Sequence, residues 1–181
     1  RAAKLSGAAA ALASQPAYNR LAAALQQELT STVRRLLLLY AFLYEENALQ
    51  RVEQYLQRGR LAEKAQVLES VDLIFNREHK KQLLPLLDHD LTAAQRAEAL
   101  GRVVPVPELT RDEWVEQIIR DERGQFGDWL AACAILGAAQ NGETGWRELT
   151  AAVTQRQHWA AQRPLAAETA QWALPNEQGD L

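Results

Sequence analysis

Several features that would cross-link the chain, export it or carry it through a membrane are missing. Cys133 is the single cysteine among 181 residues, so an internal disulfide is excluded. The longest apolar run, from Leu36 to Tyr44, falls far short of the ~20 residues that a membrane-spanning helix needs. No stretch has the pattern of a secretory signal peptide. We therefore expect a cytoplasmic segment that does not insert into a membrane.

Methionine is absent altogether, including from the first position. A chain that lacks an initiator methionine is typical of a segment taken from a longer protein. We expect this chain to be such a segment.

A strongly basic balance is also missing, because the net charge is −3. The charge is uneven: residues 1–60 carry +4, residues 61–120 carry −3 and residues 121–181 carry −4. The overall acidity argues against a general nucleic-acid binder, which is usually basic. We favour a solvated surface of uneven charge, although the asymmetry could bias which surface meets a partner.

The short motifs of common catalytic sites are absent. There is no glycine-rich phosphate loop, no GxSxG nucleophile turn and no HExxH zinc motif. Glu45 and Glu46 are adjacent, so on a helix they would not face each other as an acid and a base. Asp88-His89-Asp90 could be offered as a metal site, but we favour a polar turn because metal sites need three or four converging ligands. We predict a protein that is not an enzyme and has no cofactor.

Strong helix formers dominate what is present. Alanine, leucine, glutamine, glutamate and arginine are common, and long alternation of β-branched residues is absent. The sequence predicts one all-α domain over residues 1–175, followed by a loose tail at 176–181. The expected elements are a long helix at about 17–44, helix pairs at about 47–76, 78–103 and 110–141, and C-terminal helices at about 144–174.

Local signals predict where these helices begin and bend. Thr92, Thr110 and Asp128 are candidate N-caps, and Thr110 has a glutamate three residues later, as in a capping box. Pro85 lies inside a predicted helix and should kink it or delay its start. The second half of the long helix is apolar nearly all round, so we expect it to be buried between neighbours.

A degenerate repeat links three of the predicted helices. Ala65 and Leu68 match Ala97 and Leu100 at a spacing of 32 residues, and these match Ala132 and Ile135 at a spacing of 35 residues. A single helix pair cannot bury its apolar face, so repeated pairs are stabilised by stacking. We predict a HEAT-like α-solenoid of stacked antiparallel helix pairs, with about eight to ten helices.

Three segments also carry a likeness to a known family: LAAALQQELTSTVRRLLLLYAFLY, AQVLESVDLIFNREHKKQLLPLLD and DWLAACAILGAA. The region from Leu21 to Gly137 resembles the HEAT-like repeat region of bacterial proteins related to ATP/ADP translocases of the major-facilitator type. In that family a transporter-like membrane part precedes the repeats. The resemblance implies a helical-repeat fold and a tether to the inner membrane through a part that this chain lacks. It implies no catalytic residues.

Two groups of side chains are candidates for a site. Arg34 and Arg35 lie in an apolar helix, so we expect at least one to be partly buried and to pair with Asp72. We favour a structural ion pair there over an anion-binding spot. Four tryptophans could line a recognition groove, although we favour helix anchors in the core. They are Trp114, Trp129, Trp146 and Trp159.

These patterns favour a non-enzymatic interaction or scaffold domain that binds a protein partner or another part of its own chain. Two alternatives remain open at this point. One is a nucleic-acid-binding HEAT-like domain, which predicts a basic concave face. The other is an accessory protein similar to the HEAT-like lyases that attach bilin pigments, which predicts an absorbance change with a bilin.

Overall fold

The computed structural model describes residues 1–44, 49–50, 52, 54, 69–121, 123–142 and 145–174. All regular elements in these ranges are helices, which confirms the all-α prediction for them. The chain divides into two compact units. The first unit contains Arg1–Ala10 and Gln26–Glu108, and the second contains Ala11–Leu25 and Leu109–Leu181.

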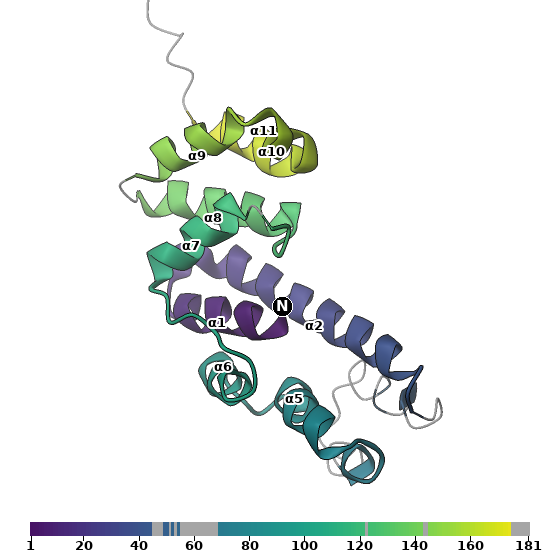
Figure 1. Ribbon diagram of the computed structural model, residues 1–181. Coiled ribbons are helices and arrows are strands. Elements are labelled where there is room, and N and C mark those ends of the chain that lie inside the picture. The colour runs from purple at the N-terminus through teal and green to yellow at the C-terminus, as the bar shows by residue number, and fades with distance from the viewer. Residues whose placement is uncertain are drawn as a thin grey trace, which may run out of the picture. The chain divides into compact units, whose positions relative to one another are not determined.

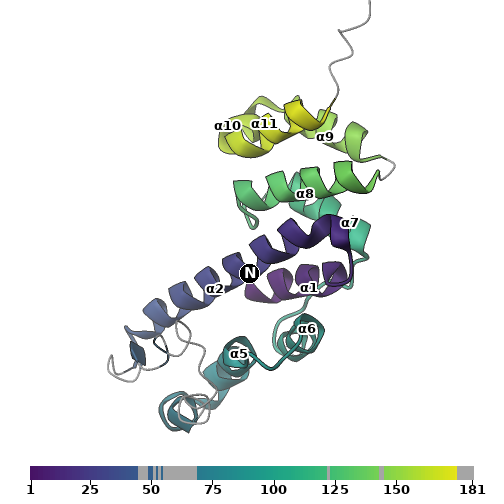
Figure 2. The ribbon, with the colours of Figure 1, turned by 180° about the vertical axis from the view of Figure 1, so that it is seen from behind.

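Four helices supply most of the described part of the first unit (Figure 1). They are α1 (Ala2–Leu12), the greater part of α2 (Asn19–Tyr40), α5 (Arg77–Leu87) and α6 (Ala93–Gly101). Helices α5 and α6 pack against each other, as Figure 2 shows from behind. Leu49 and Val52, which lie in the range of the predicted pair at about 47–76, are buried.

A buried arginine joins α5 to α6. Arg96 is only 6% exposed, and its guanidinium donates to the backbone carbonyls of Pro85, Asp88 and Leu91 at 3.2, 3.4 and 3.2 Å. Burial lowers the pKa of Arg96. These carbonyls lie at the C-terminal end of α5 and in the turn after it, where a cation is favourable and intrahelical donors are missing. Arg96 therefore holds the turn between the two helices.

The second unit is built around α8. Its elements are η1 (Pro16–Tyr18), α7 (Arg111–Arg120), α8 (Asp128–Asn141), α9 (Trp146–Thr154), α10 (Gln157–Gln162) and α11 (Pro164–Ala173). Helix α8 packs against η1, α7, α9 and α11, and both views show it between α7 and α11 (Figures 1 and 2).

Small residues let η1 come close to α8. Gly137 faces the ring of Tyr18, and a Cβ at this position would overlap the ring. Tyr18 is fully buried. Most of α8 is buried, in keeping with its Ala-rich sequence: Leu130, Ala131, Ala132, Cys133, Ala134, Ile135, Gly137 and Ala138.

Two of the predicted N-caps are confirmed. Thr92 and Thr110 each accept from the backbone N–H three residues later, and Gln95 and Glu113 complete both capping boxes. The N–H of Thr110 donates to Glu113 at 2.7 Å and lowers the pKa of that carboxyl. The helix ends found at these positions follow from contacts within one turn of the chain.

Asp128 is not an N-cap, contrary to prediction. It is the first residue of α8, after an N-cap at Gly127. Its carboxylate accepts instead from the N–H groups of Leu165 and Ala166, at 3.0 and 2.8 Å. These are orphan donors of the first turn of α11, so Asp128 caps a neighbouring helix.

Other boundaries also differ from the prediction. The long helix ends at Tyr40, and α5 begins at Arg77, so Pro85 does not delay its start. The range of about 144–174 predicted for the C-terminal helices holds three helices, and the first two, α9 and α10, end and begin on either side of residues 155–156.

The predicted burial of the second half of α2 is wrong for one side of the helix. Val33, Leu37 and Tyr40 are buried, while Leu38 and Leu39 are 62% and 63% exposed. The inward side chains recur at three- and four-residue spacing, which leaves the intervening leucines on the outer face.

The predicted repeat is described only in part. Leu100, Ala132 and Ile135 are buried, each within its own unit, and Ala97 is half-buried. Ala65 and Leu68, most of the 47–76 pair and the tail at 176–181 lie outside the described residues. The solenoid stays a prediction.

Candidate functional site

A groove of about 630 Å³ runs between α7 and α9 in the second unit. Its lining combines apolar side chains and carboxylates from both helices with guanidinium groups from α7. The lining residues are Arg111, Asp112, Val115, Glu116, Ile119, Arg120, Gly145, Trp146, Glu148, Leu149 and Ala152.

The helix α7 supplies one wall of the groove because of how its opposite side is anchored. Trp114 and Ile118 are 1% and 0% exposed, and the Trp114 ring meets Phe126 edge to face at 6.5 Å. This anchoring turns Val115 and Ile119, which are also buried, toward the base of the groove. Three- and four-residue spacing then places Asp112, Glu116 and Arg120 along the rim.

Helix α9 supplies the other wall. Trp146, Leu149 and Ala152 follow at steps of three residues and line one side. The Trp146 ring is buried, and the Arg147 guanidinium carbon lies 5.8 Å from its centroid. Gly145, the N-cap of α9, has φ 88°, a left-handed conformation that side chains rarely adopt. The turn at Gly145 therefore sets where Trp146 begins the wall.

The charges of the groove are arranged in pairs on α7. Arg111 contacts Asp112 at 2.6 Å, and Arg120 contacts Glu116 at 2.8 Å. On the α9 wall, Glu148 makes no ion pair with any residue in the described ranges. The carboxylates outnumber the guanidinium groups among the lining residues, so the groove favours a ligand with a basic group.

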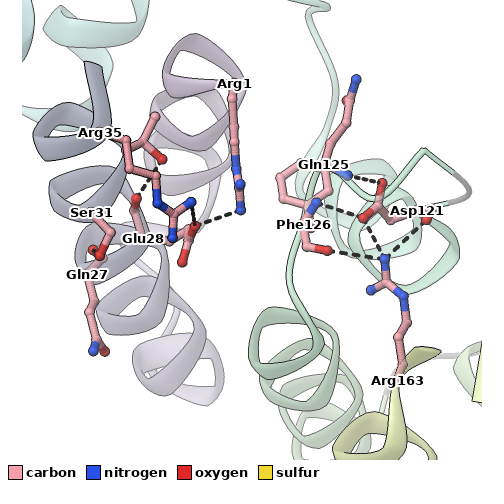
Figure 3. Close-up of polar contacts among 10 residues, drawn as sticks. Arg1, Gln27, Glu28, Ser31, Arg35, Asp121, Gln125, Phe126 and Arg163 are labelled. Carbon is pink, nitrogen blue, oxygen red and sulfur yellow. Dashed lines mark hydrogen bonds and ion pairs between the residues drawn. The ribbon is translucent and has the colours of Figure 1, made fainter. Parts of the chain in front are cut away.

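A buried polar centre fixes the C-terminal end of α7. The Asp121 carboxylate accepts from the N–H groups of Gln125 and Phe126 at 2.9 and 2.7 Å and from Arg163 at 2.6 Å (Figure 3). Arg163 also donates to the backbone carbonyls of Asp121 and Phe126, each at 3.1 Å. Both side chains are at most 6% exposed. The centre connects the α7–α8 loop to the start of α11.

One further contact supports the same end of α7. The Trp159 indole N–H donates to the carbonyl of Ile119 at 3.0 Å, and the Arg163 guanidinium carbon lies 5.9 Å from the Trp159 ring. Ile119 lines the groove, so α10 helps to hold the groove wall. Sequence reasoning missed Arg163 and Asp121, which are 42 residues apart and belong to no motif.

The predicted tryptophan set divides into two kinds. Trp114, Trp146 and Trp159 are at most 7% exposed, which confirms the helix-anchor interpretation for these three. Trp129 is 53% exposed and does not line the groove. Only Trp146 of the four reaches the groove.

The predicted ion pair between Asp72 and the arginines of α2 is wrong. Asp72 is exposed and contacts Lys80 at 2.7 Å, while Arg35 lies 3.6 Å from Glu28, which also accepts from Arg1 at 2.6 Å (Figure 3). Arg34 and Arg35 are both exposed. The two arginines are exposed for the same reason as Leu38 and Leu39. The inward face of α2 passes through Val33 and Leu37, so both arginines lie on the outer side of the helix.

Asp88-His89-Asp90 forms a turn after α5, in which the N–H of Asp90 donates to the Asp88 carboxylate at 3.1 Å. In the described part of the chain no three histidine, cysteine or acidic side chains gather as metal ligands would. Among the described helices none combines the length and the apolar character needed to cross a bilayer.

Comparison with family models, with curated proteins and with solved structures finds no match to this chain.

Proposed function

We propose that this chain is a non-enzymatic protein-interaction domain that holds a partner segment in the groove between α7 and α9. The observation that carries the proposal is the composition of the groove, which has an apolar base and charged rims. Ligand sites commonly have volumes of ~300–1,000 Å³, and the groove volume of about 630 Å³ falls in this range. Such a groove can take a few side chains of a peptide or helix.

The chemistry of the rims favours a segment that combines an apolar side chain with a lysine or arginine. Leu149, which is half-buried, and Ala152, which is exposed, would contact the apolar side chain, and Glu148 would receive the cation. Burial of the apolar group supplies affinity, and the charged pair sets orientation and rate of encounter. The same acidic excess counts against a nucleic-acid ligand, whose phosphates the groove would repel.

The wider setting is also a proposal. We propose that the helix pairs α5–α6 and α7–α8 are units of a HEAT-like repeat, and that the chain is the repeat part of a larger bacterial protein tethered to the inner membrane. What supports this is the resemblance of residues 21–137 to such a repeat region and the pairwise packing of consecutive helices within each unit. The cytoplasmic location belongs to the same proposal.

Charge reversal at the groove tests the function. Proteins retained from a cell extract by the wild-type chain are compared with those retained by Glu148→Lys and by Glu168→Lys. Both glutamates are exposed, but Glu168 lies on α11 and does not line the groove. We expect a specific partner to be retained by wild type and Glu168→Lys and lost with Glu148→Lys.

Two results would count against the groove. One is a partner retained equally by both variants, and the other is a partner lost equally from both. Helicity at 222 nm, measured for all three proteins, separates loss of binding from loss of fold.

A further inference from the structure

A segment with two prolines joins α6 to α7 outside any helix (Figures 1 and 2). We call residues 103–109, VVPVPEL, the connector. Its exposed side chains come in two adjacent pairs, Val104 with Pro105 and Pro107 with Glu108. The remaining side chains are half-buried and lie three residues apart: Val103, Val106 and Leu109. Burial along the connector therefore repeats every three residues.

This period identifies the conformation of the connector. A polyproline II helix has three residues per turn, so residues three apart share a face, whereas a β-strand alternates with a period of two. The sequence favours the same conformation, because proline fixes its own φ at about −65° and restricts the residue before it to extended geometry. One face of the connector is thus turned inward. The other two faces, formed by Val104 with Pro107 and by Pro105 with Glu108, are exposed.

The fold holds the connector in place without using its backbone. In the described part of the chain, the N–H groups of Val106 and Glu108 donate to no other group, as is usual in a polyproline II helix. Both ends are fixed, because the N–H of Val104 donates to the carbonyl of Leu100 at 2.9 Å and Thr110 caps α7. A partner would therefore meet a segment that is already ordered, which favours binding.

We infer that the connector is a docking segment for a partner domain whose shallow groove is lined by aromatic rings. Such grooves bind polyproline II ligands by packing their rings against prolines and the apolar side chains beside them. The pair Val104 and Pro105 and the ring of Pro107 supply these contacts on the two exposed faces. The inward face is left for the chain's own packing.

Charges at the two ends of the connector add a direction to the docking. Arg102 is exposed just before the connector, and Glu108 is exposed near its other end. Arg102 pairs with Glu98 at 2.6 Å, but both side chains are exposed, and such pairs are weak enough to exchange for another carboxylate. The complementary groove has an acidic group at the Arg102 end and a basic group at the Glu108 end. The inference goes beyond the proposed groove function and uses different residues.

Titration of the full chain into isolated, isotope-labelled SH3 and WW domains tests the inference, because aromatic rings line the grooves of these domains. We expect amide signals at the groove of at least one domain to shift, with a dissociation constant between ~10 µM and ~1 mM. Pro105→Ala and Pro107→Ala should each weaken binding about fivefold or more, since each removes a ring that packs in the groove. Pro164→Ala is the matched control, because Pro164 is also exposed but begins α11.

Four results would overturn the inference: no groove shift in any domain at about 1 mM chain, connector variants that bind like wild type, an equal loss with Pro164→Ala, or slowed exchange of the Val106 and Glu108 amides in the complex. The last would show pairing with a strand in place of docking in an aromatic groove. Val104→Ser, which keeps both prolines, replaces a proline variant that loses helicity at 222 nm. Glu148→Lys should bind the domains like wild type, which separates the connector from the groove between α7 and α9.

Discussion

Arg163 and Asp121 form the contact whose loss should cost the second unit most. Arg163→Ala removes a guanidinium that is 2.6 Å from the Asp121 carboxylate and that also donates to two backbone carbonyls. Breaking a buried ion pair by removing one partner costs about 3–5 kcal/mol, because the other charge stays buried without its counter-ion.

Two details of the geometry place the expected loss near the lower end of this range. Asp121 keeps the N–H donors of Gln125 and Phe126, so its carboxylate is not left without hydrogen bonds. Nη1 of Arg163 is buried without a hydrogen-bond partner among the described residues. The wild-type pair therefore already carries a desolvation cost, which Arg163→Ala removes. We expect a loss of about 3 kcal/mol, and a fall in Tm of roughly 6–12 °C for a chain of this size.

Urea denaturation followed at 222 nm measures the free energy of unfolding. The matched control is Arg102→Ala, because Arg102 forms an ion pair with Glu98 at 2.6 Å but its side chain is 75% exposed. Exposed pairs contribute about 0–1 kcal/mol, so the control should unfold almost like wild type. The reasoning is refuted if Arg163→Ala loses no more stability than Arg102→Ala. In a double-mutant cycle, the double variant Arg163→Ala/Asp121→Ala should lose less stability than the sum of the losses of the two single variants.

Three further outcomes are expected. Gly137→Ala should destabilise the protein by about 1–3 kcal/mol in thermal melting, because a methyl group would overlap the Tyr18 ring. The control is Gly101→Ala, whose added methyl group meets no atom within 4 Å, so its melting temperature should be unchanged or higher. Cys133 is 3% exposed, and its burial raises the pKa of the thiol to about 11. A disulfide reagent at pH 8 should therefore label it only in denaturant. Rapid labelling of the folded protein would contradict this. Thr110→Ala removes a capping box and should cost about 1 kcal/mol in the same urea assay, and an unchanged midpoint would count against the cap.

The signals that predicted the fold correctly are satisfied close by in the chain. Thr92 and Thr110 cap helices through residues three positions later. Two further helix ends follow from equally local features. Gly142 ends α8 in the left-handed conformation that glycine tolerates. Pro164 begins α11, where a missing N–H has no cost. Such contacts depend on little beyond the local sequence.

The predictions that failed depend on which distant group lies nearby. Asp128 has the residue type and position of an N-cap, but its carboxylate serves the first turn of α11. Asp72 has an apolar sequence context that suggests burial, yet it is exposed and pairs with Lys80. The groove also needs two helices to be placed side by side, and no pattern in either helix alone indicates it.

For the described residues, the sequence alone determined that the chain is helical and where several helices begin and end, because backbone groups at helix ends are satisfied within a few residues. The tertiary structure alone decided which side of α2 is exposed, that Arg163 reaches Asp121, and that α7 and α9 border a groove. These outcomes follow from packing between segments far apart in the chain, since burial of one helix face determines what the opposite face presents.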